Sequence, residues 1–305
     1  MFWYSWNSFI LAVDACIHDG FLALVDINKQ YSDDYLYHQL SRLQQKFESS
    51  ATHGGVFTNL TTTILEEFLV PFPISIQEQE YIANTLSDID LLIEQLDKLI
   101  VKKKNIKQGA MQELLTGKRR LPGFKGEWEV KLFGTLIDID KGQQINKSEL
   151  TATGEYPDWN GGIEPSGYTD KWNTEAYTIT ISEGGNSCGF VNFCKENFWL
   201  GGHCYALKII NSNLHKLFLF QLLKFKEKNI MGLRIGSGLP NIQKKNLKEF
   251  ELYVPLDTKE QSAIAQVLSD MDLEIEELEE KRDKYLKLKT GMMQQLLTGR
   301  IRLKC

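Results

Sequence analysis

An internal repeat is the feature of this chain that most limits how it can fold. Residues 65–121 match residues 247–303 at a constant offset of 182, without a gap, and 27 of the 57 aligned positions are identical. The shared landmarks are Phe68 with Phe250, Pro73 with Pro255, Glu78-Gln79 with Glu260-Gln261, and the phrase Leu-Leu-Thr-Gly at 114–117 and 296–299. Two copies this far apart do not make a solenoid, in which each repeat contacts the next. The two copies instead flank residues 122–246, which lie outside the two matched segments.

Each copy carries the heptad pattern of a long helix. Apolar residues recur at steps of four and three, at Ile82, Leu86, Ile89, Ile93, Leu96 and Ile100 in the first copy, and at Ile264, Leu268, Met271, Ile275 and Leu278 in the second. Each run extends from the Glu-Gln pair to the Thr-Gly pair, which is about 38 residues or about 55 Å of helix. Gly117 and Gly299 stand where such a helix would end.

Charge predicts how the two helices pair. Residues 78–97 hold six acids and no base, whereas residues 102–120 hold seven bases and one acid; the second copy has eight acids in 259–280 and eight bases in 281–305. A parallel pair would place like charges side by side, while an antiparallel pair places each acidic half beside a basic half. We therefore expect an antiparallel coiled coil. The alternative is two separate amphipathic helices, each packed on its own domain.

The regions outside the helices predict mixed globular domains. Residues 126–246 alternate apolar strands, as at 177–181 and 205–210, with Gly- and Asn-rich loops and a helical stretch near 214–225. The offset of 182 continues upstream, placing 36–40 opposite 218–222 and Gly54 and Asn59 opposite Gly236 and Asn241. We therefore expect an α+β protein with a first globular domain at 1–64, shorter by about 57 residues than its counterpart, a helical region at 65–125, a second domain at 126–246 and a second helical region at 247–305.

Composition bounds the class of protein. The 305 residues suit two or more domains, and 42% hydrophobic and 25% charged residues are typical of a globular protein in water. Residues 1–13 are apolar but lack the basic start and cleavage site of a signal peptide, so we expect a cytoplasmic protein without a membrane span. The net charge of −5 is weak evidence against DNA binding. It is weak because contacts with phosphate depend on the local distribution of Lys and Arg and not on the total charge.

The five cysteines, Cys16, Cys188, Cys194, Cys204 and Cys305, are an odd number spread along the chain, so we expect reduced thiols. Three of them fall near His203, which raises the alternative of a zinc site. No C-x2-C pair is present, however, and small buried side chains are the better interpretation.

The chain resembles the specificity subunit of type I restriction-modification enzymes. The resemblance is carried by the phrases EQEYIANTLSDID and EQSAIAQVLSDMD, MQELLTGKRRLPGF and MQQLLTGR, GSGLPNIQKKNLKEF, KGQQINKSEL, NGGIEPSGYTDKW and ISEGGNSCGF, and it covers nearly the whole chain. It implies that each globular domain is a target-recognition domain reading one half of a split double-stranded DNA sequence. It also implies that the helices space the two halves and bind two modification (methyltransferase) subunits, with the restriction subunit reached through the complex.

No catalytic motif is found in the sequence. It has neither an Asn-Pro-Pro-aromatic tetrapeptide nor a G-x-x-x-x-G-K-[ST] phosphate loop, and His203 with Cys204 has no identifiable orienting partner, so both are expected in the core. We therefore expect a non-catalytic chain without a cofactor of its own; S-adenosylmethionine would be bound by the partner methyltransferase.

Three loops are candidates for DNA contact, since amides can pair with adenine edges and cations with phosphate or guanine. The residues are Lys141, Gln143, Gln144, Asn146 and Lys147 in the first, Asn160, Tyr168, Thr169 and Lys171 in the second, and Arg234 and Ser237 in the third. Each loop could equally be an ordinary surface turn, and Asn186 and Asn241 could equally cap turns.

Apolar residues off the heptad seam are candidates for partner binding: Leu91, Leu92, Leu115, Leu273 and Leu297. The leading hypothesis is a DNA-recognition subunit that positions methyltransferase and restriction subunits. The runner-up is a half-type specificity fragment that serves assembly, by competing for the methyltransferase or by needing a second copy.

Overall fold

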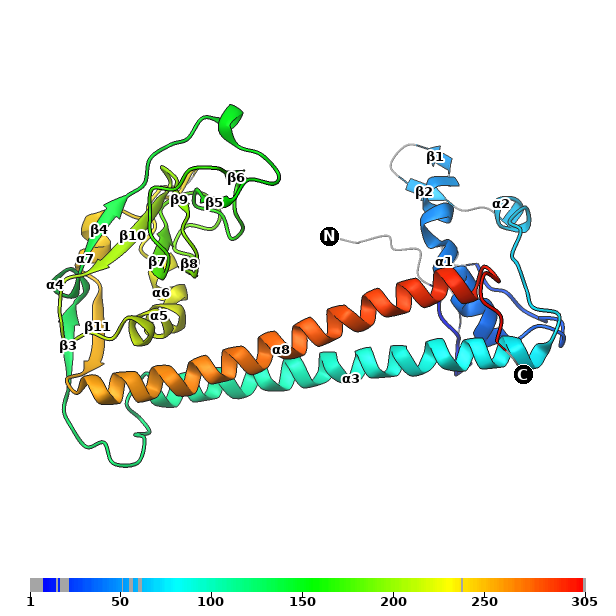
Figure 1. Cartoon of the computed structure of the whole chain (residues 1–305), viewed down its shortest axis with the longest axis horizontal. Helices are drawn as coiled ribbons and strands as arrows, with labels where there is room; N and C mark the ends of the chain where they lie inside the picture. Colours follow the sequence, from blue (N-terminus) through cyan, green and yellow to red (C-terminus); the bar gives the residue numbers. More distant parts are fainter. Residues whose placement is uncertain are drawn as a thin grey trace. The chain divides into compact units, whose positions relative to one another are not determined.

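The chain folds as two compact units. The computed structural model describes residues 8–14, 16, 22–50, 52–54, 57–59, 62–236 and 238–303 (Figure 1). Unit 1 comprises residues 1–102 and 276–305, and unit 2 comprises residues 103–275. The residues of each long helix are divided between the two units, whereas the predicted domain boundaries keep each helix in one region. The predicted boundaries therefore stay a prediction.

The two long helices have the lengths that the heptad pattern predicts. Helix α3 (Ile76–Leu114) and helix α8 (Thr258–Leu296) each span 39 residues, and their ends are related by the same offset of 182. The seam is largely buried, at Ile82, Leu86, Ile93, Leu96, Ile100, Ile264, Leu268 and Ile275. Just beyond the helices, Gly117 and Gly299 adopt φ of 69° and 72°, the left-handed conformation that commonly ends a helix at glycine.

Within each unit the helices run antiparallel. In unit 1, Lys289 pairs with Asp90 at 2.5 Å and Arg282 with Asp97 at 3.5 Å. In unit 2, Lys103 pairs with Glu274 at 2.5 Å, and Lys107 pairs with Asp272. Residue numbers rise along α3 while those of its partners fall along α8. This is the order that the charge pattern predicts.

Unit 1 builds a small core on the start of α3 and the end of α8. Its other elements are helix α1 (Asp33–Ser50), the hairpin of β1 (Thr52–Gly54) and β2 (Phe57–Asn59), and helix α2 (Thr62–Glu66). The core contains Tyr35, Ile82, Ala83, Leu86, Leu296 and Leu297. Helix α1 supplies Tyr35, the two long helices supply Ile82, Ala83, Leu86 and Leu296, and Leu297 directly follows α8.

Unit 2 is organised around an antiparallel sheet in the order β4-β10-β7-β8. These strands are β4 (Ile137–Lys141), β10 (Cys204–Ile209), β7 (Thr178–Ser182) and β8 (Val191–Cys194). Helix α5 (Lys216–Phe225) lies between this sheet and the long helices, and Gln221 of α5 donates to Asp272 of α8 at 2.8 Å (Figure 1). The strands and helix predicted near 177–181, 205–210 and 214–225 are confirmed.

Two smaller sheets complete unit 2. Strand β3 (Trp128–Leu132) pairs antiparallel with β11 (Glu251–Pro255), which leads into α8. Strands β6 (Tyr168–Thr169), β5 (Tyr156–Trp159) and β9 (Trp199–Leu200) form the other sheet. The connecting helices are α4 (Phe133–Leu136), the 3-10 turn at Lys147–Glu149, α6 (Glu227–Met231) and α7 (Lys244–Lys248).

The repeat extends to hydrogen bonds before α1 and α5, but with a shift of one residue. The Gln79 side chain accepts from the N–H of Ser32 at 2.8 Å, and its repeat counterpart Gln261 accepts from the N–H of His215 at 2.7 Å. Ser32 and His215 are separated by 183 positions, not 182. The offset predicted for residues 36–40 is therefore wrong by one residue. The segment from the start of α1 to the start of α3 is one residue longer than the segment from the start of α5 to the start of α8.

Candidate nucleic-acid interface

The first candidate loop follows β4 and is held against the turn between β9 and β10. The N–H of Gln143 donates to the carbonyl of Leu200 at 2.9 Å, and the carbonyl of Gln143 accepts from the Trp199 indole at 2.8 Å. Gly142 has no room for a side chain, since a Cβ there would lie 2.1 Å from the carbonyl oxygen of Gly201. The backbone is anchored on both sides while the side chains of Gln143 and Gln144 are exposed.

Asn160 joins the second candidate loop to the first. Its side chain accepts from the N–H of His203 at 3.0 Å and donates to Gln144 at 3.4 Å. A second link runs through Glu149, which accepts from Asn146 at 3.2 Å and from Lys171 at 3.1 Å. The structure therefore brings the loops at 141–147 and 160–172 together.

The third loop pairs with the segment after β7. Ile235 exchanges hydrogen bonds with Asn241, and the N–H of Ile242 donates to the carbonyl of Glu183 at 2.8 Å. Glu183 in turn pairs through its carboxylate with Lys141 at 2.7 Å. All three loops are thus linked through the residues around Glu183, although the loops are far apart in the sequence. Ser237 lies outside the described residues.

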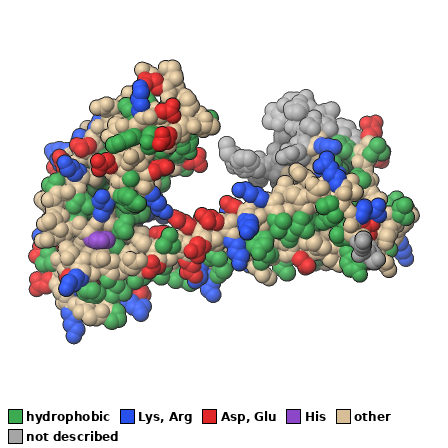
Figure 2. All heavy atoms as spheres, viewed as in Figure 1, with side chains coloured by type: hydrophobic (Ala, Val, Ile, Leu, Met, Phe, Trp, Pro, Cys, Tyr) green, Lys and Arg blue, Asp and Glu red, His purple; other side chains and the backbone are tan. Residues whose placement is uncertain are grey.

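The charges of the candidate residues are partly neutralised. Lys141 pairs with Glu183, and Lys171 and Asn146 together lower the pKa of Glu149, so that this carboxyl stays ionised. Lys147 and Arg234 are exposed and have no ion-pair partner within the described parts of the chain. On the visible face of unit 2, acidic and basic side chains are interspersed (Figure 2). Among the candidate residues, Lys147 and Arg234 are therefore the cations most available to bind an anion such as a phosphate.

Two candidate residues have structural roles. Thr169 is 3% exposed, so the expectation that it contacts DNA is corrected: it pairs across β5 and β6, and its hydroxyl accepts from the N–H of Lys171 at 3.4 Å. Asn160 is half-buried and uses its amide to hold His203 and Gln144. Tyr168, beside Thr169, is 38% exposed and keeps its ring at the surface.

The expectation that His203 lies in the core is wrong. Its neighbour Cys204 is buried in β10 as expected, but His203 itself is exposed beside the first two loops. His203 lies in the turn before β10, where its N–H donates to Asn160, and it is therefore outside the strand whose residues 204–207 are buried. The sequence signal for this turn is the Gly201-Gly202 pair directly before it. Leu239, 85% exposed in the third loop, was also missed.

The cysteines of unit 2 are small buried side chains, and Cys305 lies outside the described residues. Cys188, Cys194 and Cys204 are buried, and burial raises the pKa of Cys194 and of Cys204 to about 12, so these thiols stay protonated. Among the residues that the structure describes, no group of three His, Cys, Asp or Glu side chains is placed to hold a metal ion. Within the same described residues, no helix has the length and apolar character needed to cross a membrane.

The candidate partner residues on the long helices divide into two groups. Leu91 and Leu273 are each 53% exposed, and Leu92 is half-buried. Leu115 and Leu297 are 1% and 0% exposed, so the expectation that they stay accessible is corrected. Both lie just past a helix end, where the chain turns back and packs them into the core of their own unit. Leu91 and Leu273 are repeat counterparts, one on each helix.

A further apolar surface lies in unit 1. A groove of about 500 Å³ runs along α8 and is lined by Leu288, Met292, Leu296, Ile301 and Leu303 together with four more polar or small residues. Leu288 and Ile301 are 49% and 51% exposed. Hydrophobic side chains are visible along the helices of unit 1 in Figure 2.

Comparisons with known proteins agree on one family. Residues 7–103 and 125–288 match the model of the type I restriction modification DNA specificity domain. The chain is 36% identical over 152 residues to a putative type I specificity subunit of Mycoplasma genitalium, covering 50% of this chain and 39% of that protein. It is 33% identical over 172 residues to one of Mycoplasma pneumoniae, covering 56% and 46%. The matched part thus spans less than half of these two relatives.

Other matches cover more of the chain. The specificity subunit of the type I restriction enzyme MjaVIII of Methanocaldococcus jannaschii is 27% identical over 309 residues, covering 91% of this chain and 72% of that protein. The crystal structure of a type I restriction-modification S subunit from M. genitalium shares the fold, with a TM-score of 0.72 and 21% identity, covering 89% of this chain and 74% of that one. With two matched segments spanning both units and most of the chain, this protein belongs to the type I restriction modification DNA specificity domain family.

Proposed function

We propose that the chain is the DNA sequence-recognition subunit of a type I restriction-modification complex and has no catalytic site of its own. It would place two methyltransferase subunits, and through them the restriction subunit, on a split double-stranded DNA target in the cytoplasm. The observation that carries the proposal is the convergence of the three loops in unit 2, where anchored backbones present exposed amides and two cations that pair with no described acid. Family membership supports it, since the relatives are named as specificity subunits.

The loops divide by chemistry into two kinds of contact. Gln143 is suited to reading a base edge, because its backbone is fixed on both sides and its exposed amide can form a bidentate pair with adenine. Lys147 and Arg234 are suited to phosphate, or in the case of Arg234 to guanine. Gln144, Asn146 and Lys171 already have protein partners and would have to exchange them for DNA.

Binding measurements on the complex with the methyltransferase would test this division. Methylome sequencing of cells that express both proteins first identifies the target. For Lys147→Ala we expect weaker binding to all sequences and a salt slope smaller by about one unit. For Gln143→Ala we expect a loss of about 1 to 3 kcal/mol in binding and relaxed preference at one base.

Lys131→Ala is the control, since Lys131 is a half-buried cation on β3, away from the three loops, that pairs with Glu129. Its affinity and salt slope should match those of the unmodified chain. If neither Lys147→Ala nor Gln143→Ala changes affinity, slope or base preference, the first loop is a structural turn and the proposal for it is wrong.

The exposed leucines on the long helices support the recruitment of a methyltransferase. Leu91 and Leu273 occupy the same repeat position and are equally exposed, one in unit 1 and one in unit 2. Exposed apolar residues along a paired helix commonly contact a further partner. Two equivalent sites fit two methyltransferase subunits.

Substitution of these leucines tests the two sites separately. Leu91→Glu or Leu273→Glu should each reduce the methyltransferase to one subunit per chain, because burying an unpaired carboxylate is costly, and the double variant should lose both. Native mass spectrometry gives the stoichiometry. Asn84→Glu, which adds the same charge at an exposed position of α3, is the control. Full occupancy in the double variant would place the methyltransferase elsewhere.

A further inference from the structure

The hairpin that carries the third loop is fixed at its base. Ile235 and Asn241 exchange two backbone hydrogen bonds, at 2.8 and 3.0 Å. Asn241 also bridges to Gly184, in the segment after β7, and the carbonyl of Pro240 accepts from the N–H of Gly185 at 3.0 Å. The arm that leads out of the loop is therefore bonded to two neighbouring segments.

Leu239 lies at the tip of this hairpin and faces solvent. It is 85% exposed, more than any other large hydrophobic side chain among the described residues of unit 2. Its backbone is restricted by Pro240, because a proline ring disfavours the helical conformation of the residue before it. On its other side lies Gly238, where a Cβ would meet nothing within 4 Å. A large apolar side chain thus projects from an anchored arm into open space.

The surroundings of the tip are polar and basic. Arg234 stands on the incoming arm, is exposed, and pairs with no acid among the described residues. Beside the outgoing arm, a Cβ on Gly184 would lie 3.7 Å from the carbonyl oxygen of Pro240 and 4.0 Å from Nδ1 of His203. The N–H of His203 donates to Asn160 of the second loop at 3.0 Å. Leu239 therefore belongs to the same surface as the amides and cations of the candidate loops.

The extent of the apolar surface favours DNA over a protein as the partner. Among the described residues of the hairpin at 234–241, the exposed large hydrophobic side chains are Leu239 and Ile235, and Ile235 is 44% exposed. A protein partner is usually met by a contiguous apolar patch of roughly several hundred Å². A single apolar side chain beside cations fits duplex DNA instead, because the cations contact phosphates while a leucine can enter between base pairs.

The anchored arm is suited to such an insertion. Separating two stacked base pairs costs free energy, which is offset by the further contacts that a bent duplex makes with the protein. A side chain that is already held in an extended arm loses less conformational entropy on binding than one on a mobile loop. The bonds of Asn241 and Pro240 provide this preorganisation.

We propose that Leu239 inserts between two adjacent base pairs of the half-site read by unit 2 and unstacks them. The inference rests on the proposed DNA-recognition function, and it adds that the half-site is deformed as well as read. Base steps differ in the cost of deformation, and pyrimidine–purine steps are the most easily unstacked. We therefore expect a pyrimidine–purine step at the point of insertion, so that Leu239 contributes to sequence preference.

Fluorescence of 2-aminopurine, which rises when this base is unstacked, tests the insertion in the complex with the methyltransferase. The probe replaces one base at a time along the mapped half-site of unit 2. The unmodified chain should raise the fluorescence about threefold or more at one step, and Leu239→Ala should abolish that rise. A probe at the base that is methylated is the reference, because the methyltransferase turns that base out of the duplex with either chain.

Binding measurements separate insertion from a charge effect. Leu239→Ala should weaken binding by about tenfold, the loss expected when one leucine side chain is no longer buried. The salt slope should stay unchanged, because no phosphate contact is lost. Leu239→Met keeps a similar apolar volume and should retain most of the affinity and of the fluorescence rise.

Ile210→Ala is the matched control. Ile210 is 59% exposed and directly follows β10, at the end of the strand opposite to His203. Its replacement removes an exposed apolar side chain of the same size as Leu239 and should change neither affinity nor fluorescence. Circular dichroism verifies that all three variants fold.

The outcomes distinguish the insertion from the DNA-recognition function. If Leu239→Ala binds as well as the unmodified chain and gives the same fluorescence, in a complex that prefers its mapped target, the insertion is wrong and the recognition function stands. Weaker binding without unstacking at any step would place Leu239 against a base edge, such as a thymine methyl group, and would also overturn the insertion. An unmodified complex that binds its mapped target no better than unrelated DNA would overturn the recognition function and the insertion together.

Discussion

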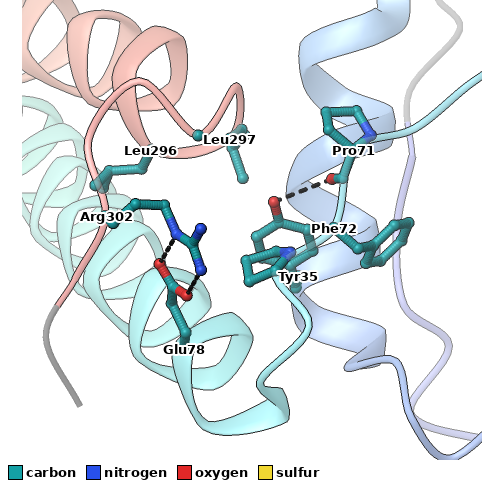
Figure 3. Close-up of a pocket in the computed structure, with 9 residues that line it drawn as sticks. Tyr35, Pro71, Phe72, Glu78, Leu296, Leu297 and Arg302 are labelled. Atoms are coloured by element: carbon teal, nitrogen blue, oxygen red, sulfur yellow. Dashed lines mark hydrogen bonds and ion pairs between the residues drawn. The ribbon is translucent and has the colours of Figure 1, made fainter.

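The two ends of the helix pair have the same ion pair in different surroundings. In unit 2, Arg120 pairs with Glu260. In unit 1, their repeat counterparts Arg302 and Glu78 pair in the same way (Figure 3). Glu260 and Glu78 are both buried, but the Arg120 side chain is 26% exposed and that of Arg302 is 62% exposed. The difference follows from Trp128, which covers the first pair and has no described counterpart over the second. A repeated sequence therefore reproduces the backbone and the pairing, while the burial of the site depends on what packs over it.

The largest effect that separates the two units is expected in their cores. Leu86 and Leu268 occupy the same repeat position and are both 0% exposed, so replacement of either by alanine should lower the free energy of unfolding by about 2 to 5 kcal/mol. Leu268→Ala should cost more, because the larger core of unit 2 has less freedom to collapse around the cavity. Guanidinium unfolding followed by hydrogen exchange of each unit measures this. A greater loss for Leu86→Ala would reverse the ranking.

The stability of unit 2 should also depend on pH, because of the buried carboxyl of Asp158. This carboxyl in β5 is 0% exposed, neither oxygen has a hydrogen-bond partner in the described structure, and burial raises its pKa to about 6 from 3.8. The folded state therefore holds a proton that the unfolded state releases, so unit 2 loses stability as pH rises from about 4 to about 6.

Asp158→Asn tests this dependence. The variant should be more stable than the unmodified chain at pH 7, by up to about 3 kcal/mol, and about equal to it at pH 4. The difference between the two proteins isolates this carboxyl from other titrating groups. Chemical denaturation at several pH values, read by hydrogen exchange in unit 2, gives the result. A gain that is the same at pH 4 and pH 7 would contradict the assignment.

The smallest effect should come from the ion pairs themselves. Double-mutant cycles with Glu260→Gln and Arg120→Gln, and with Glu78→Gln and Arg302→Gln, should give coupling energies of about 2 and about 1 kcal/mol. The first is larger because its arginine is less exposed to solvent. Hydrogen bonds from Arg302 lower the pKa of Glu78, so its contribution is lost as pH falls below the ordinary range for a glutamate. Equal couplings would mean that Trp128 does not shield its pair.

Much of the fold could be predicted because its signals are local or periodic. The seam from Ile82 to Ile100 and the glycines at 117 and 299 predict both helix ends, and the charge halves predict antiparallel order. The candidate site was harder. The residues of the three loops were selected by composition, and their linkage through Glu183 depends on pairing between segments distant in the sequence. Thr169, Leu115 and Leu297 were misplaced because exposure at the end of an element depends on what packs there.

The sequence by itself determined the repeat, the two helices and their relative direction, since apolar periodicity and charge act along the chain. Only the tertiary structure decided which polar side chains are available, as with Lys147 against Lys141, because that depends on which acid lies across the fold. It also decided that two equivalent sites differ, since Trp128 covers one and no described tryptophan covers the other. A local pattern specifies the lining of such a site, but its occupant comes from a strand elsewhere, and strand pairing is a long-range contact that no local pattern encodes.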